Sequence, residues 1–238
     1  MFTNTQPIES SNRRASGSLE VHSIFYTIQG EGPFAGWPAV FIRLAGCNLQ
    51  CPGCDTDYTS KRELLIPRDI ADRACALLTR EITPTAINQP LVVITGGEPF
   101  RQNLQPLVEI LLQRGLQVQV ETNGLLEIPE YVGYFCLVVC SPKTSKINPK
   151  NLDKIDAFKY VINTDSVSLE DGLPNSVLGM GAKVYRPDLK MLPCPIYVQP
   201  MDSKDDEQNK QNLAAALNSA MKFGYILQLQ IHKIIGVE

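Results

Sequence analysis

The amino-acid sequence predicts an α/β fold, a partial and open β/α barrel of about six parallel strands. Short runs rich in valine, isoleucine and aromatic residues alternate with amphipathic helical patterns along the 238 residues. Such alternation implies right-handed crossovers between parallel strands. A closed eight-stranded barrel typically needs about 250 residues, and only roughly 200 remain beyond a polar N-terminal segment, so we expect the barrel to stay open.

Six or seven strands are expected, because β-branched and aromatic side chains favour extended backbone. The runs that predict them are residues 39–44, 91–95, 117–121, 135–140, 157–162, 195–199 and 226–231.

Three helices are expected between these strands. Pro67 suits the first turn of a helix, where its missing N–H is not needed. Gly115 is a typical residue just past a helix end, and Asp205 begins an acidic run that favours the N-terminal end of a helix. The predicted helices are residues 67–80, 104–114 and 203–223.

Composition indicates one domain. Hydrophobic residues make up 44% of the chain and the net charge is −3, which gives no general attraction to nucleic acid or to anionic membranes. Residues 1–18 are polar and rich in Ser, Asn and Thr, so we expect a disordered leader before a single domain at 19–238. The apolar stretch of an export signal does not follow Arg13 and Arg14, no run is apolar enough to cross a bilayer, and a cytoplasmic location is expected.

Three cysteines, Cys47, Cys51 and Cys54, follow the first predicted strand at spacings of four and three residues. Three thiolates in one loop can bind a 4Fe-4S cluster and leave one iron open to a small molecule. A zinc site is the first alternative, but zinc usually takes a fourth protein ligand, and the two histidines, His22 and His232, lie far away in the sequence. Unligated thiols are the second.

The other four cysteines show no regular spacing. Cys136 and Cys140 lie in an apolar run and are interpreted as small buried residues of a strand. A disulfide framework fits poorly, because seven cysteines are an odd number and the chain shows no secretory segment. The remaining two are Cys75 and Cys194.

Paired glycines follow the second predicted strand in the run Gly96-Gly97-Glu98-Pro99. Glycines let a backbone approach a ligand closely, and a carboxylate beside them can hold an ammonium group. An ordinary strand-to-helix turn would use the same residues. The cysteines and this run both fall at carboxyl ends of strands, where ligands of such sheets bind.

Together the two motifs resemble those of radical S-adenosylmethionine (SAM) enzymes. The resemblance implies that SAM binds the open iron through its amino and carboxylate groups, and that reductive cleavage of SAM yields a 5′-deoxyadenosyl radical. The chain departs from the superfamily at Gly53, where many members carry an aromatic residue near the adenine.

Further segments resemble the 7-carboxy-7-deazaguanine synthase family, from about residue 23 to the last residue. They are Thr27-Ile28-Gln29-Gly30-Glu31-Gly32, Phe41-Ile42-Arg43-Leu44, Cys54-Asp55-Thr56, Ser141-Pro142-Lys143, Val198-Gln199-Pro200 and Gln230-Ile231-His232-Lys233.

Some of these residues can also be interpreted chemically. Gln29 and Glu31 can present an amide and a carboxylate to a guanidine-like edge, although a polar turn would also use them. Arg43 lies in an otherwise apolar strand and faces either solvent or a carboxylate at the barrel mouth. His232, near the last predicted strand, is either structural or functional. The resemblance implies a substrate site made of Gln29, Glu31, Arg43, Thr95, His232 and Glu238.

The resemblance also implies cofactor ligands. Thr56 is implied as a magnesium ligand, since Mg²⁺ prefers oxygen atoms and needs few from the protein. The alternative is that Asp55 and Thr56 cap the following turn. The implied SAM-binding residues are Gly96, Gly97, Glu98, Thr122, Ser141, Lys143 and Gln199.

The resemblance implies a carbon-nitrogen lyase that converts 6-carboxy-5,6,7,8-tetrahydropterin to 7-carboxy-7-deazaguanine with loss of ammonia, in 7-deazapurine (queuosine) biosynthesis. The radical would abstract the hydrogen at C6 of the pterin, and no side chain would act as a nucleophile. A homodimer and an electron donor such as flavodoxin or ferredoxin are implied as well. Two alternatives stay open: a radical SAM activase of a glycyl-radical enzyme, and a small electron-transfer or zinc-binding protein.

Overall fold

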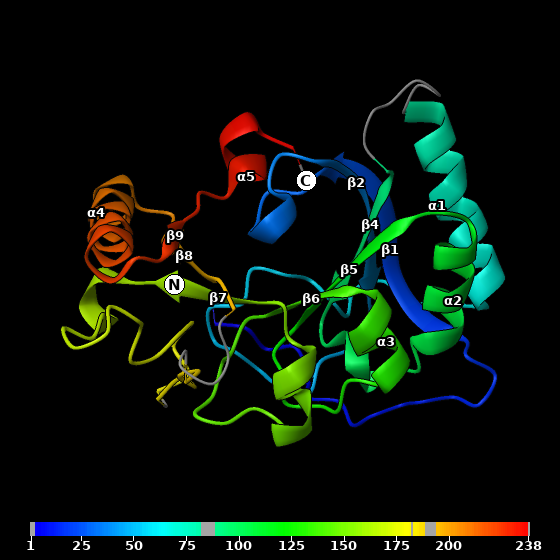
Figure 1. Cartoon of the computed structure of the whole chain (residues 1–238), viewed down its shortest axis with the longest axis horizontal. Coiled ribbons are helices and arrows are strands. Elements are labelled where there is room, and N and C mark those ends of the chain that lie inside the picture. The colour runs from blue at the N-terminus through cyan, green and yellow to red at the C-terminus, as the bar shows by residue number, and fades with distance from the viewer. Residues whose placement is uncertain (1–2, 82–88, 182, 189–193, 238) are drawn as a thin grey trace.

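One nine-stranded sheet forms the centre of the computed structural model of the chain (Figure 1), which describes residues 3–81, 89–181, 183–188 and 194–237. The strand order is β3-β1-β2-β4-β5-β6-β7-β8-β9. From β2 to β9 every neighbouring pair is parallel. The two end strands, β3 and β9, do not pair with each other within the described residues, so the predicted open parallel barrel is confirmed.

The elements are as follows. The strands are β1 (Leu19–Ile28), β2 (Pro38–Leu44), β3 (Glu63–Leu65), β4 (Leu91–Gly96), β5 (Gln117–Thr122), β6 (Leu137–Cys140), β7 (Ala157–Ile162), β8 (Ile196–Pro200) and β9 (Ile226–Leu227). The helices are α1 (Pro67–Glu81), α2 (Gln105–Gln113), α3 (Glu130–Phe135), α4 (Asp206–Phe223) and α5 (Ile231–Ile235). Short 3-10 turns are η1 (Gly32–Phe34), η2 (Pro99–Arg101), η3 (Pro149–Lys154) and η4 (Thr164–Ser166).

Several boundaries differ from the prediction. The antiparallel strands β1 and β3 extend one edge of the sheet and were not expected. The strand predicted at 135–140 begins at Leu137, because α3 continues to Phe135. The strand predicted at 226–231 ends at Leu227, because the side-chain amides of Gln228 and Gln230 bond to the turn that follows β1 instead.

Helices α1 to α4 lie on the outer side of the sheet. Figure 1 shows α1, α2 and α3 gathered at one end of the molecule and α4 beside β8 at the other. Alternate residues of β2 and β4, such as Ile42 and Ile94, join the large apolar core. The residues between them, such as Ala39 and Val93, form a second apolar cluster inside the barrel. Because strand side chains alternate, inward-facing positions nearer the carboxyl ends are free to be polar.

The polar N-terminal segment is bound to the barrel, so the prediction of a disordered leader at 1–18 is corrected for residues 3–18. Ile8 forms a β-bridge with Cys47, and Asn12 forms one with Gln102. The backbone N–H of Glu9 donates to the Cys47 carbonyl at 2.7 Å. The composition of this segment suggested disorder, because the segment offers little apolar surface to bury. Backbone hydrogen bonds and ion pairs hold the segment in place instead. Among the described helices, none is long and apolar enough to span a membrane.

Candidate active site

The three-cysteine motif forms an irregular loop just past the carboxyl end of β2. Cys47 and Cys51 are buried and Cys54 is half-buried. Two of the sulfur atoms make long contacts, 3.9 Å from Cys47 Sγ to Asn48 Oδ1 and 3.8 Å from Cys54 Sγ to the Thr56 carbonyl. Burial raises the pKa of the Cys47 thiol to about 12. A buried thiol with weak partners gains most from a metal, which binds its thiolate form.

The three cysteines on one loop are the thiolate ligands that a 4Fe-4S cluster with one open iron needs. Burial also raises the pKa of Cys51, and the Lys143 ammonium opposes that shift.

The paired glycines bring the end of β4 against the backbone that leads into the cysteine loop. Gly96 has a φ of +126°, and a Cβ atom there would lie 2.2 Å from the Leu44 carbonyl oxygen. A Cβ atom on Gly97 would lie 1.9 Å from the Gly46 carbonyl oxygen. From the sequence we expected these glycines to let the chain approach a ligand closely. In the structure they let the chain approach the backbone of Leu44 and Gly46.

Glu98 connects two of the turns at the carboxyl ends of the strands. Its buried carboxylate accepts hydrogen bonds from Thr122 Oγ1 at 2.8 Å, from the Asn123 N–H at 2.8 Å and from the Phe100 N–H at 3.0 Å. Burial raises the pKa of Glu98, and these hydrogen bonds oppose the shift. A carboxylate accepts about four hydrogen bonds, so one position is left for an ammonium group.

Six of the seven predicted SAM-binding residues lie at the carboxyl ends of β4, β5 and β6. Beyond β6, Lys143 Nζ donates to the Ser141 carbonyl at 2.7 Å and to Ser141 Oγ at 2.6 Å. Burial lowers the pKa of Lys143, and attraction to Cys51 opposes the shift. The seventh, Gln199, lies apart from them on β8, where its Nε2 donates to Glu31 Oε1 at 3.1 Å.

A buried charge cluster occupies the inner face of the barrel. Lys159 Nζ bonds to Glu31 Oε2 and lies 2.7 Å from Glu121 Oε2. Gln230 Nε2 donates to Glu31 at 2.6 Å. Burial alone would raise the pKa of Glu31, but the Lys159 ammonium outweighs it and holds the pKa well below its usual range. Glu31 is therefore a carboxylate at neutral pH.

Gln29 links the two acidic residues of this cluster. Its Nε2 donates to Glu121 Oε1 at 3.1 Å, and its Oε1 accepts from the Glu31 N–H at 3.0 Å. Sequence reasoning missed Glu121 and Lys159. Lys159 carried a usable signal, since it is a lone cation within a predicted apolar strand, the same signal that drew attention to Arg43.

The other predicted substrate residues lie on β2, β4 and α5. Arg43 is paired in register with Thr95, and its guanidinium carbon lies 5.0 Å from the centre of the Phe25 ring. His232 lies on α5, not at a strand end, and its ring packs against Gly30, where a Cβ atom would lie 1.9 Å from Nδ1. Burial lowers the pKa of His232, and the Glu31 carboxylate opposes the shift.

Thr56, the predicted magnesium ligand, lies in the cysteine loop and not on the strands that carry this cluster. Thr56 Oγ1 lies 3.5 Å from Asp55 Oδ1, and Asp55 also pairs with Lys233 at 3.1 Å. The following turn is capped by Asp57, whose Oδ1 accepts from the Thr59 and Ser60 N–H groups. Glu238 lies outside the described residues.

An open parallel barrel with a three-cysteine loop after its first parallel strand, and a glycine pair closing on that loop, defines the class of radical SAM enzymes. The family described as 4Fe-4S single cluster domain matches residues 28–135. A protein from Rhodospirillum rubrum named 7-carboxy-7-deazaguanine synthase is 42% identical over 235 residues, which cover 92% of this chain and 93% of the relative.

Further comparisons agree. A protein of the same name from Rickettsia prowazekii is 39% identical over 227 residues, covering 92% of this chain and 89% of the relative. The crystal structure of QueE from Escherichia coli matches with a TM-score of 0.64 at 25% identity and covers 89% of this chain and 93% of that one. The chain belongs to the 7-carboxy-7-deazaguanine synthase family. This membership confirms the predicted family, the lyase class and the 4Fe-4S and SAM cofactors.

Proposed function

We propose that the chain converts 6-carboxy-5,6,7,8-tetrahydropterin to 7-carboxy-7-deazaguanine with loss of ammonia, as a step of 7-deazapurine biosynthesis. The observation that carries the proposal is the buried cluster of Glu31, Glu121 and Lys159 inside the barrel mouth. It provides a fixed carboxylate and amides in a chain whose relatives carry the name of this synthase.

Glu31 and Gln29 are the residues suited to the guanidine-like edge of the pterin. Three of the roughly four acceptor positions of Glu31 are occupied, by Lys159, Gln199 and Gln230. One N–H group of the substrate would bond to the remaining position of Glu31. A second would replace the side-chain amide of Gln199 or Gln230. Two adjacent N–H donors on a guanidine match the two oxygens of a carboxylate.

Arg43 and Thr95 are suited to the carboxylate of the substrate. They lie side by side on β2 and β4, and a guanidinium fork matches a carboxylate in geometry and charge. His232 covers Gly30, between Gln29 and Glu31, so α5 would limit access of water to the bound pterin.

The bound cofactors supply the radical that abstracts the substrate hydrogen. The residues that would hold SAM are Gly96, Gly97, Glu98, Thr122, Ser141 and Lys143, because their turns meet beside the cysteine loop. Gln199 lies apart from these residues, on β8, and would contact SAM from that strand. Thr56 would offer its hydroxyl to a magnesium ion, with substrate oxygens and water completing the shell. The proposal also includes a homodimer, Glu238 as a further substrate ligand, a cytoplasmic location, and an electron donor such as flavodoxin or ferredoxin.

Anaerobic turnover tests the proposal. The reconstituted protein, with dithionite, SAM, Mg²⁺ and 6-carboxytetrahydropterin, should release 7-carboxy-7-deazaguanine, measured by mass spectrometry. Cys54→Ala is the control, and it should release neither product nor 5′-deoxyadenosine. Formation of 5′-deoxyadenosine without deazaguanine would reject the substrate while keeping the enzyme class, and an activase would then be the better assignment.

A further inference from the structure

Residues 3–14, here called the N-terminal strap, lie against the cysteine loop. The strap has extended backbone, with Asn4, Gln6, Glu9 and Asn12 turned towards the protein while many of the residues between them are exposed. The cysteine loop itself, residues 45–62, contains turns and bends but no helix or strand. Its backbone groups therefore need partners from outside the loop.

The strap supplies those partners at the cysteines themselves. The Glu9 N–H donates to the Cys47 carbonyl at 2.7 Å. Asn4 Nδ2 donates to the Cys51 carbonyl at 3.1 Å, and the Asn4 N–H donates to the Pro52 carbonyl at 2.9 Å. Two of the three cysteines are thus held through their backbone by the strap.

Gln6 holds the part of the loop that follows the third cysteine. Its Nε2 donates to the Thr56 carbonyl at 2.9 Å, and its Oε1 accepts from the Tyr58 N–H at 2.8 Å and from Thr59 Oγ1 at 3.0 Å. Gln50 Nε2 in turn donates to the Gln6 carbonyl at 2.7 Å. The Gln6 side chain therefore bonds to three residues, 56, 58 and 59, in the second half of the loop.

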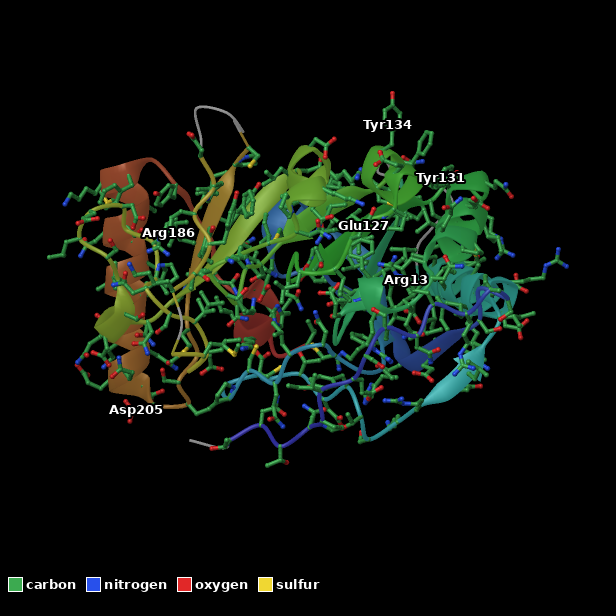
Figure 2. The ribbon with its side chains drawn as sticks, turned by 90° about the horizontal axis from the view of Figure 1, so that it is seen from below. Arg13, Glu127, Tyr131, Tyr134, Arg186 and Asp205 are labelled. Atoms are coloured by element: carbon green, nitrogen blue, oxygen red, sulfur yellow. The ribbon has the colours of Figure 1, made fainter. Side chains whose placement is uncertain are left out.

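Charged residues anchor the other end of the strap to the barrel. The guanidinium of Arg13 donates to the carbonyls of Phe100 and Glu127, and Figure 2 labels Arg13 and Glu127 at this contact. The buried guanidinium of Arg101 lies 3.2 Å from Glu9 and 2.8 Å from the Ser10 carbonyl. Arg101 also donates to the Ala45 carbonyl at 3.1 Å, so this anchor joins the strap to the barrel and to the first residue of the cysteine loop.

We propose that Asn4 and Gln6 are positioning residues, through which the strap preorganises the cysteine loop for the cluster and slows loss of the cluster. The inference rests on the proposed function only in requiring that the chain hold a 4Fe-4S cluster. Cluster loss requires the loop to open, and local opening is governed by the few contacts that hold the segment, not by global stability. One hydrogen bond of this kind shifts an equilibrium by roughly two- to tenfold, and the two side chains make at least four with the loop, so removing both should speed opening by roughly 30-fold or more.

The test compares the double variant Asn4→Ala, Gln6→Ala with a matched control, Gln89→Ala, Asn148→Ala. The control removes the same residue types from the surface, where Gln89 donates to the Gly115 carbonyl and Asn148 accepts from the Lys150 N–H, both away from the loop. Reconstituted proteins are challenged anaerobically with an iron chelator, and cluster loss is followed by absorbance. Urea unfolding of each apo protein measures global stability.

The strap variant should lose its cluster roughly 30-fold faster than wild type or more, and the control should stay near wild type. The apo stability of the strap variant should fall by no more than the same factor, because the unfolded chain lacks these hydrogen bonds as the opened loop does. Gln6→Ala alone should move the rate in the same direction by a smaller factor. Equal rates of cluster loss in the strap variant and wild type would overturn the proposal, and so would a control that loses its cluster as fast as the strap variant. A wild-type protein that takes up no cluster would refute the proposed function instead.

Discussion

Replacing Lys159 by methionine should destabilise the apo protein by about 3–5 kcal/mol at pH 8. Lys159 is 5% exposed, and its ammonium contacts two carboxylates, those of Glu31 and Glu121, which are 14% and 18% exposed. At an effective dielectric constant of 20, each contact attracts by about 4–6 kcal/mol, and burial of the three charges offsets most of the sum. Methionine fills the volume but leaves two carboxylates together without their cation.

The destabilisation should shrink as the pH falls. In wild type the pKa of Glu31 is lowered on folding, so its contribution is complete above its unfolded value and is lost only as the pH falls towards the folded value. In Lys159→Met the same carboxyl, buried beside Glu121, should have its pKa raised above the unfolded value. The folded variant then takes up a proton as the pH falls from 8 to 5, which stabilises it relative to the unfolded chain.

Urea unfolding at pH 8 and pH 5 measures both effects. Lys150→Met is the control, because Lys150 pairs with Glu127 on the surface, where such a pair contributes about 0–1 kcal/mol. Adding Glu121→Gln to Lys159→Met should recover part of the loss by removing one of the two carboxylates. A cost below about 1 kcal/mol at pH 8, or a cost that does not change with pH, would show that Lys159 does not hold this cluster together.

Two further predictions concern the site. Gly97→Ala should prevent β4 from closing on the Gly46 turn, because the new Cβ atom would lie 1.9 Å from the Gly46 carbonyl oxygen; the iron content after reconstitution should fall well below that of wild type, and wild-type iron content would contradict this account. Glu31→Gln should lower kcat/KM for the pterin by roughly 10- to 10²-fold, as expected when a charged hydrogen-bond partner is lost, while the cluster absorbance stays unchanged; an unaltered kcat/KM would remove Glu31 from the substrate site.

Much of the parallel barrel could be predicted because its strands carry a local signal. β7 is predicted to the residue, and β2, β4 and β5 to within one residue at each end. β1 gave no clear signal, since its polar and apolar residues are mixed, and its pairing with β2 depends on contacts distant in sequence. The strap at residues 3–14 was misjudged for a related reason: its composition says nothing about carbonyl groups of the cysteine loop that need donors.

The residues of the candidate site could also be predicted only in part from the sequence. Motifs with short spacing, such as the three cysteines and the glycine pair, could be found in the sequence alone. Lys159 was signalled only as a lone cation in an apolar strand. Its contact with Glu121 could not be predicted, because it arises only when β5 and β7 lie on either side of β6 and both side chains turn inward. The alternation that fills the outer face with apolar residues places polar ones on the inner face at the same time. A lone charged residue in a buried strand is therefore an informative sign of the inner site, provided that a second strand supplies the opposite charge.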